Sequence, residues 1–142
     1  MYPILFERRC IAIDTMGCGE WNGGPATEGV YRSLSGEMTV AFCSDGDTYP
    51  ACGVLGGLDG APSGNWKRHG NGELERLPSF HLEALAPHEA VIFRSCAGGG
   101  YGDPVQRDPE RVAKDIARQW LSRERAELIY KVALVPSEDG VG

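Results

Sequence analysis

Hydrophobic and polar residues alternate in several short stretches of the first two thirds of the chain, and this alternation is typical of β-strands. Residues 37–45, EMTVAFCSD, show it most regularly, with Met38, Val40 and Phe42 on one face. Residues 2–14 predict an earlier strand by the same criterion. The pattern therefore predicts a chain that begins as β-structure.

A further alternating stretch, residues 79–85, has the sequence SFHLEAL. Its spacing predicts a strand that turns Phe80 and Leu82 inward to a core. The same spacing turns His81 and Glu83 outward. We therefore expect His81 to be a solvated side chain.

Two more features complete the predicted β-structure. Residues 89–95, EAVIFRS, are a short apolar run typical of a buried strand. Residues 66–77 hold Asn71 and Gly72, which tolerate the positive φ of a tight turn. A β-hairpin is expected there.

Three glycine-rich segments interrupt the strands, at residues 17–29, 53–64 and 97–103. The chain has 20 glycines among 142 residues, about twice the ordinary share of roughly 7%. Aromatic and aliphatic residues are interleaved with these glycines, which favours packed segments over flexible linkers. We expect polyproline-like segments that approach one another closely. The structural glycine motif is expected at Gly98, Gly99, Gly100, Tyr101, Gly102, Asp103 and Pro104.

The last third of the chain changes to a helical pattern. Asp108 can cap a helix that begins at Pro109, and Ser122 can cap a second helix over residues 123–130. The apolar side of the first helix is expected at Val112, Ala113, Ile116, Ala117 and Trp120. Its solvent side is expected at Lys114, Asp115 and Arg118.

Together these elements predict a mainly β fold of the α+β class, with glycine-rich polyproline-II-like segments and a short C-terminal helical hairpin. The length fits one domain overall. Within it we expect a glycine-rich β part at 1–107 and a helical tail at 108–134 that packs on it. Residues 135–142 are expected to be a frayed tail.

Charge and composition exclude several classes of partner. The formal net charge of -6 disfavours nucleic acid and anionic membranes, because both need a basic surface. The sequence has no apolar run near the roughly 18 residues of a membrane-spanning helix, and its start does not resemble a signal peptide. Its five scattered cysteines fit free thiols in a reducing compartment. We therefore expect a cytoplasmic protein.

Two binding chemistries are weakly supported. The glycines from Gly98 to Gly102 lack the lysine and hydroxyl residue of a phosphate-binding P-loop, and Asp103 would repel an anion. Five cysteines and three histidines could supply zinc ligands, but the spacing of the cysteines does not match structural zinc sites. The sequence thus leaves any metal ligands unknown.

Two catalytic arrangements are also weakly supported. Cys96 and His81 could form a nucleophile and base pair, and Asp45 with Asp47 could share a proton or bind a cation. The segment around the two aspartates has the composition of a turn. No catalytic or cofactor-binding residue is therefore assigned.

Four stretches resemble, in order and spacing, the C-terminal region of the hydantoinase B/oxoprolinase family. They are DTMGCGEWNGGPA, YPACGVLGGLDGAPSG, LPSFHLEALAPHEAVIFRSCAGGGYGDPVQRDPERVAKDI and SRERAELIYKVAL. The resemblance runs from Asp14 to Leu134, and GGGYGDPVQRDPERV is its most specific part. Ala26 stands where the family usually has glycine, and Cys96-Ala97 replaces a Pro-Gly pair, which affects the local backbone.

The resemblance implies that the catalytic and metal-binding residues of the family lie outside this chain. It implies a stand-alone small subunit similar to that of acetophenone carboxylase, not catalytic alone. Its expected partners are larger hydantoinase-A-like and hydantoinase-B-like subunits, which would hold ATP and a divalent cation.

Two reactions of such a complex stay open, ATP-dependent ketone carboxylation and amide-ring hydrolysis of the hydantoinase or oxoprolinase type. An isolated domain without activity is a third alternative.

A docking subunit must bury part of its surface against its partner, and large aromatic residues carry much of an interface's energy. Trp21, Trp66 and Tyr101 are the candidate interface residues. Trp120 is a further aromatic candidate, but its register with the apolar side of the first helix predicts a core position. We expect the glycine segments and the first strand to face the partner.

Overall fold

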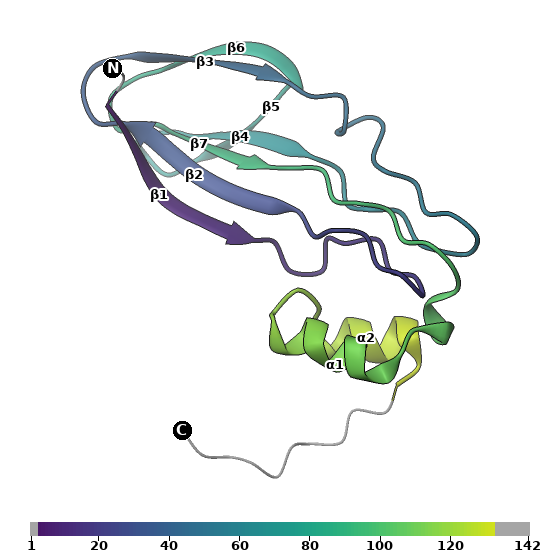
Figure 1. The fold of residues 1–142 in the computed structure, drawn as a ribbon. Helices are drawn as coiled ribbons and strands as arrows, with labels where there is room; N and C mark the ends of the chain where they lie inside the picture. The colour runs from purple at the N-terminus through teal and green to yellow at the C-terminus, as the bar shows by residue number, and fades with distance from the viewer. Residues whose placement is uncertain (1–2, 133–142) are drawn as a thin grey trace, which may run out of the picture.

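The computed structural model describes residues 3–132, which form two antiparallel sheets and a C-terminal helical part (Figure 1). The elements within these residues are β1 (Ile4–Ile11), β2 (Thr27–Ser33), β3 (Met38–Cys43), β4 (Gly64–Arg68), β5 (Leu74–Leu77), β6 (Phe80–Leu85), β7 (Ala90–Arg94), the 3-10 helix η1 (Pro104–Gln106), α1 (Pro109–Ala117) and α2 (Arg123–Tyr130). The larger sheet has the strand order β1-β2-β7-β4-β5, and β3 pairs with β6 in the smaller one. The predicted mainly β fold with two C-terminal helices is confirmed.

The predicted hairpin and the predicted strands at 2–14, 37–45, 79–85 and 89–95 are present with shifted ends, whereas β2 was not expected. β2 begins inside the glycine segment at 17–29 and includes Gly29. The packing around Gly29 shows why this strand position is a glycine. A Cβ on Gly29 would lie 2.4 Å from the ring of Phe93 on the neighbouring strand. Glycine at this position therefore makes room for an aromatic ring.

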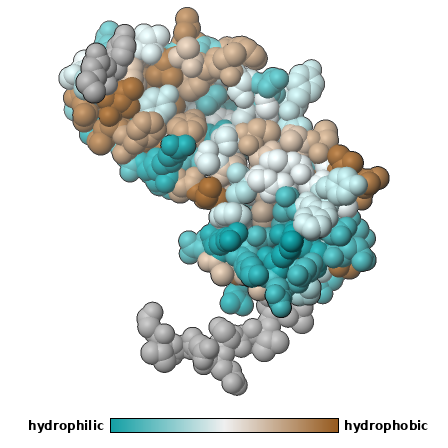
Figure 2. All heavy atoms as spheres, in the orientation of Figure 1, coloured by the Kyte–Doolittle hydropathy of each residue, from teal (hydrophilic) through white to brown (hydrophobic). Residues whose placement is uncertain are grey.

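The described residues bury two separate apolar clusters. One lies between the sheets and is formed by Met38, Leu85 and Val91, with Tyr31, Val40 and Phe42 packed against it. The other joins the helices to the chain that follows β1, and its buried members are Met16, Cys18, Val112, Leu121, Ala126 and Tyr130. Figure 2 shows a mostly hydrophilic helical end, while hydrophobic residues gather over the strands.

The prediction for the two faces of β6 is wrong. Phe80 and Leu82 are 67% and 69% exposed, while His81 and Glu83 are partly buried. The reason is a cross-sheet contact: Lys67 of β4 donates a hydrogen bond to Glu83, so the polar face of β6 turns toward the larger sheet. The predicted alternation along β6 is present, but the face that turns inward is the polar one, because it carries the partner of the buried Lys67.

Both helix caps are as predicted. The Asp108 carboxylate accepts a hydrogen bond from the Glu110 N–H, and the Ser122 hydroxyl accepts one from Arg125. Pro109 occupies the first position of α1.

The predicted faces of α1 need correction. Asp115 is buried rather than solvated, and Ala113 and Ala117 are exposed. The helix ends at Ala117, so Trp120 lies beyond it, where it is partly buried against the helical cluster. Asp115 is buried because Arg107 and Asn22 approach it from outside the helix.

The predicted frayed tail at 135–142, and residues 133–134 of the predicted helical tail, lie outside the described residues. The division into parts at 1–107 and 108–134 stays a prediction. Within residues 3–132, no helix has the length and apolar character needed to cross a membrane.

Candidate functional site

Three glycine-rich segments, residues 17–24, 53–61 and 97–102, lie side by side and form what we call the glycine ladder. The last of them bonds to both others through its backbone. The Gly98 N–H donates to the Gly24 carbonyl at 2.8 Å, and the Gly100 N–H donates to the Leu58 carbonyl at 2.9 Å. These bonds order the segments without any side chain.

The segments approach more closely than side chains would allow. A Cβ on Gly99 would lie 2.1 Å from the carbonyl oxygen of Cys52, and one on Gly57 would lie 2.2 Å from that of Gly100. Such distances are far below van der Waals contact, so only glycine fits these positions. Close packing explains most of the glycines in the ladder, while the polyproline-like conformation stays a prediction.

The ladder does not offer a phosphate cradle. The N–H groups of Gly98, Gly100, Tyr101 and Gly102 all donate to backbone carbonyls. Asp103 accepts a hydrogen bond from the Val105 N–H and caps η1. Four of the five N–H groups from Gly98 to Gly102 are therefore already used, which leaves no nest of free donors for an anion.

An apolar surface covers one end of the ladder and is called the tip patch, consisting of Trp21, Val54, Leu55 and Tyr101. Tyr101 forms β-bridges to both Trp21 and Val54, which brings the three segments together. Each patch side chain is at least half exposed, and Leu55 reaches 72%. The Arg111 guanidinium lies 4.5 Å from the ring centre of Trp21. The tip patch is thus an apolar, aromatic surface on a rigid backbone.

The structure separates the predicted interface residues. Trp21 and Tyr101 lie together in the tip patch, whereas Trp66 is on β4 and partly buried. Arg76 and Arg94 lie over its ring at 4.5 and 5.4 Å from the ring centre. Trp66 therefore belongs to a different surface.

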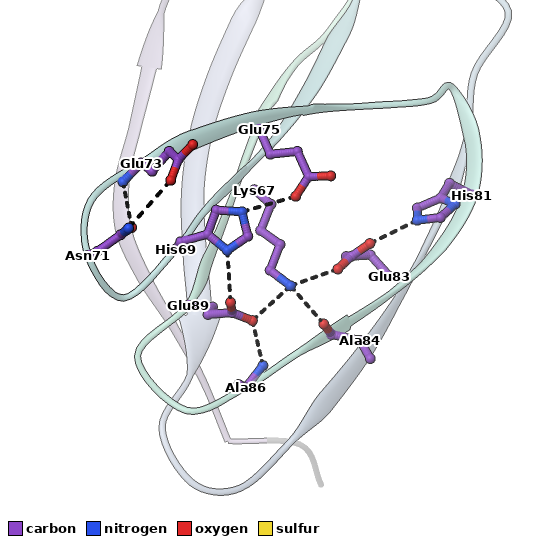
Figure 3. A network of polar contacts seen from close by, with 10 residues as sticks. All are labelled: Lys67, His69, Asn71, Glu73, Glu75, His81, Glu83, Ala84, Ala86 and Glu89. Carbon is purple, nitrogen blue, oxygen red and sulfur yellow. Dashed lines mark hydrogen bonds and ion pairs between the residues drawn. The ribbon is translucent and has the colours of Figure 1, made fainter.

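A second polar feature, the Lys67 clamp, connects the two sheets (Figure 3). The Lys67 Nζ lies 2.8 Å from a Glu83 oxygen, 2.9 Å from a Glu89 oxygen and 3.2 Å from the Ala84 carbonyl. Its hydrogen bonds hold the pKa of the Glu83 and Glu89 carboxyls below their ordinary range. The same contacts, first that with Glu83, raise the pKa of Lys67. The clamp is a nearly buried ion network.

Two histidines extend the clamp toward solvent. His69 lies between Glu89 and Glu75, with nitrogen–oxygen distances of 3.1 and 3.0 Å. His81 contacts the second oxygen of Glu83 at 2.8 Å. His81 keeps 37% of its side chain exposed, so it is partly solvated as expected, but it is also paired with the clamp, which the sequence did not predict.

Sequence reasoning missed a third polar group, which lies beneath the helices. Arg107 donates to Asp115 at 2.8 Å, and Asn22 donates to the same oxygen at 3.0 Å. The Tyr130 hydroxyl donates to Asn22 at 2.7 Å, and burial raises the pKa of Tyr130. Asn22 in a glycine segment and Arg107 before the helix carry no periodic signal, so only the fold shows this group.

The two catalytic arrangements considered from sequence are not assembled. Among the described residues no hydrogen bond joins Cys96 to His81, and the Cys96 thiol contacts the Ala97 carbonyl at 3.4 Å. Asp47 is ion-paired with Arg76 and accepts a hydrogen bond from Ser79, and the bond from Ser79, followed by that from Arg76, lowers its pKa.

Asp45 and the possible zinc ligands complete the list of sites considered from the sequence. The Asp45 carbonyl accepts hydrogen bonds from two following N–H groups, as expected of a turn. In the part of the chain from 3 to 132, no group of three or more histidine, cysteine or acidic side chains could hold a metal ion. The five cysteines are free thiols.

Comparison with known proteins shows that the chain is similar to the caprolactamase of one bacterium. The chain is 32% identical over 137 residues to caprolactamase subunit beta of Pseudomonas jessenii, covering 94% of this chain and 24% of that protein. The solved structure of ATP-dependent caprolactamase from that organism has a TM-score of 0.77 at 26% identity, covering 95% of this chain and 24% of that one. The chain thus spans about a quarter of the caprolactamase chains.

Two carboxylases are also similar. The acetophenone carboxylase delta subunit of Aromatoleum aromaticum is 49% identical over 57 residues, which is 37% of this chain and 8% of that subunit. A nucleotide-free acetone carboxylase structure, solved for the mechanism of ATP-dependent acetone carboxylation, has a TM-score of 0.80 at 20% identity, covering 97% of this chain and 22% of that one. This second likeness shows a shared fold.

The sequence model of hydantoinase B/oxoprolinase matches residues 1–104. This range holds both sheets and the whole glycine ladder. The chain therefore belongs to the hydantoinase B/oxoprolinase family.

Proposed function

We propose that this chain is a non-catalytic structural part of an ATP-dependent enzyme complex, in which the tip patch docks on a larger hydantoinase-B-like subunit. The observation that carries the proposal is the tip patch itself. Three segments that the glycine ladder holds rigidly present Trp21 and Tyr101 side by side, each about half exposed. Preordered aromatic side chains lose little conformational entropy on docking, which suits them as interface anchors.

The internal pairing of the charged residues supports a structural role. Lys67, Asp47 and Asp115 each make ion pairs within the chain that join separate elements. In the proposed complex, ATP and a divalent cation are bound by the larger hydantoinase-A-like and hydantoinase-B-like subunits. This chain contributes packing surface to them.

The reaction proposed for the complex is carboxylation of a ketone. The 49% identity with the acetophenone carboxylase delta subunit supports it, although the match covers 57 residues. The fold shared with acetone carboxylase is consistent with it.

Hydrolysis of an amide ring is a second candidate reaction, and it is supported by a match that covers more of the chain. Caprolactamase subunit beta aligns over 94% of this chain, and caprolactamase by its name acts on a lactam. The two reactions share the proposed docking role and differ in the substrate that drives ATP hydrolysis.

A pull-down with the tagged chain tests the proposed assembly. The chain is purified from its native cells, and mass spectrometry identifies the proteins that stay bound in fixed stoichiometry. Recovery of two larger hydantoinase-type subunits is expected. Recovery of the folded chain alone would contradict the proposal and favour an isolated domain.

Substitutions in the tip patch test the docking surface. Tyr101→Ala is expected to weaken binding to the recovered subunits about fivefold or more, since truncating an interface anchor costs over about 1 kcal/mol. Tyr49→Ala is the matched control, because Tyr49 is 78% exposed outside the tip patch. Equal binding by both variants would exclude the tip patch as the docking surface.

The recovered complex then decides between the reactions. ATP hydrolysis that requires a ketone and bicarbonate supports carboxylation. Hydrolysis that requires a lactam or hydantoin, with ring opening, supports the second candidate. The product identified by mass spectrometry provides an independent check.

A further inference from the structure

The larger sheet has an outer face that turns away from β3 and β6. Tyr31 and Val91 point to the inner face, where they pack against the smaller sheet. Their neighbours along each strand therefore point outward. The register places these side chains on the outer face: Arg8, Cys10, Glu28, Val30, Arg32, Trp66, Arg68, Leu74, Arg76, Ile92 and Arg94.

The outer face differs in charge from the rest of the chain. It carries five arginines, and the acids that contact them are Glu7, Glu28 and Asp47. The whole chain has a formal net charge of -6. An excess of positive charge on one sheet face of an acidic protein indicates a surface that is complementary to acidic groups.

Most of these arginines have ion partners within the chain. Glu7 sits at a register shift in β1 and bridges Arg32 at 3.0 Å and Arg68 at 2.7 Å. Arg8 is paired with Glu28. These pairs hold the arginine side chains across the face of the sheet.

Arg94 is the exception among the outer-face arginines. Its guanidinium lies 5.4 Å from the ring centre of Trp66, and its Nε is buried without a hydrogen-bond partner. Within residues 3–132 it makes no ion pair. Because the Nε is buried, only the outer nitrogens of the Arg94 guanidinium can meet an external group, and a guanidinium that lines the surface without an ion pair is a favourable partner for a carboxylate.

Arg94 also lies where two surface cavities meet. One cavity of about 310 Å³ is lined by Arg8, Glu28, Trp66, Leu74, Ile92 and Arg94. A second cavity of about 340 Å³ shares Arg8, Glu28 and Arg94, and extends to Ile11 and Ile13. Together they form an outer groove with a charged middle and apolar side chains toward both ends.

We propose that this outer groove binds an acidic segment of a larger subunit of the complex, in which a carboxylate between two apolar side chains pairs with Arg94 and Arg8. The proposal rests on the proposed function and names a second contact surface in the same assembly. The apolar ends of the groove can pack against apolar side chains of a protein segment, whereas a free anion would make no contact with them. The -6 charge of the chain disfavours nucleic acid in the same place.

Charge reversal tests the groove. The dissociation constant between the chain and the larger subunits recovered in the pull-down is measured for the wild type, Arg94→Glu and Arg123→Glu. Arg123 is exposed at the start of α2 and provides the same change of charge away from the groove. Arg94→Glu is expected to weaken binding at least tenfold, and Arg123→Glu less than twofold.

A second variant protects the test against misfolding. Arg8 has 59% of its side chain exposed, so Arg8→Glu is expected to leave the fold intact while it removes the second cation of the groove. Circular dichroism and thermal unfolding confirm folding of each variant. Arg8→Glu is expected to weaken binding at least fivefold and to reduce the dependence of binding on salt.

The outcomes separate the two proposals. If the wild type binds no larger subunit, both proposals fail. If the wild type binds and both groove variants bind equally well, the groove proposal is overturned while the tip-patch proposal stands. A photo-crosslinker at Leu74, which is 57% exposed at one end of the groove, is expected to label an acidic segment; labelling of a basic segment would also overturn the groove proposal.

Discussion

The glycine ladder and the Lys67 clamp stabilise two regions of the chain by opposite means. The ladder consists of backbone hydrogen bonds between segments that approach so closely that most of their glycines have no room for a Cβ. The clamp consists of charged side chains that cross from one sheet to the other. The ladder is therefore sensitive to added volume, whereas the clamp is sensitive to loss of charge and to pH.

The largest effect is expected from a single added methyl group in the ladder. Gly99→Ala places a Cβ 2.1 Å from the Cys52 carbonyl oxygen, which forces two backbones apart. We expect a loss of roughly 3 kcal/mol or more in the free energy of unfolding, at the upper end for overpacking. Urea unfolding followed by tryptophan fluorescence measures it.

The matched control is another glycine in the same ladder. A Cβ on Gly24 would have nothing within 4 Å, so Gly24→Ala is expected to change the free energy of unfolding by at most about 0.5 kcal/mol. Equal effects at the two positions would show that general glycine flexibility, and not close approach, stabilises the ladder. A larger residue, as in Gly99→Val, is expected to be worse than alanine.

A smaller effect is expected when the clamp loses its cation. Lys67→Met keeps most of the unbranched side chain but leaves Glu83 and Glu89 without their shared partner. Breaking a fully buried pair costs about 3–5 kcal/mol, and the clamp is slightly solvent-accessible, so we expect a loss of about 2 kcal/mol. Lys114→Met on the exposed side of α1 is the control and is expected to change stability by at most about 0.5 kcal/mol.

The sequence allowed the backbone-determined features to be predicted. The caps at Asp108 and Ser122 and the turn at Gly72 follow from local chemistry, and the structure has all of them. Dense glycine interleaved with aromatic residues likewise predicted close packing. The cap and turn signals lie within a few residues of the features that they predict, and the glycine signal lies in the segments that pack.

Features that depend on distant residues were not predictable in the same way. Asp115 is buried by Arg107 and Asn22, and the latter is 93 residues away. The direction of β6 depends on Lys67, because a buried lysine requires acidic partners from the opposite sheet. Periodicity reports which residues share a face, but it cannot report which face another element covers.

The smallest effect is the pH dependence of the stability losses in Lys67→Met and Gly99→Ala. It also separates the Lys67 clamp from the glycine ladder most sharply. The pKa values of Glu83 and Glu89 are held below their ordinary value of 4.5, so their contribution is present above that pH and is lost as the pH falls through the lowered values. The raised pKa of Lys67 keeps the lysine charged throughout this range. The stability difference between the wild type and Lys67→Met should therefore be smaller at pH 3.5 than at pH 7. The difference between the wild type and Gly99→Ala should stay constant, because the contact is with a backbone carbonyl and no ionisable group takes part in it. Urea unfolding of the three proteins at both pH values measures the two differences. If both differences changed together with pH, the comparison between clamp and ladder would be wrong.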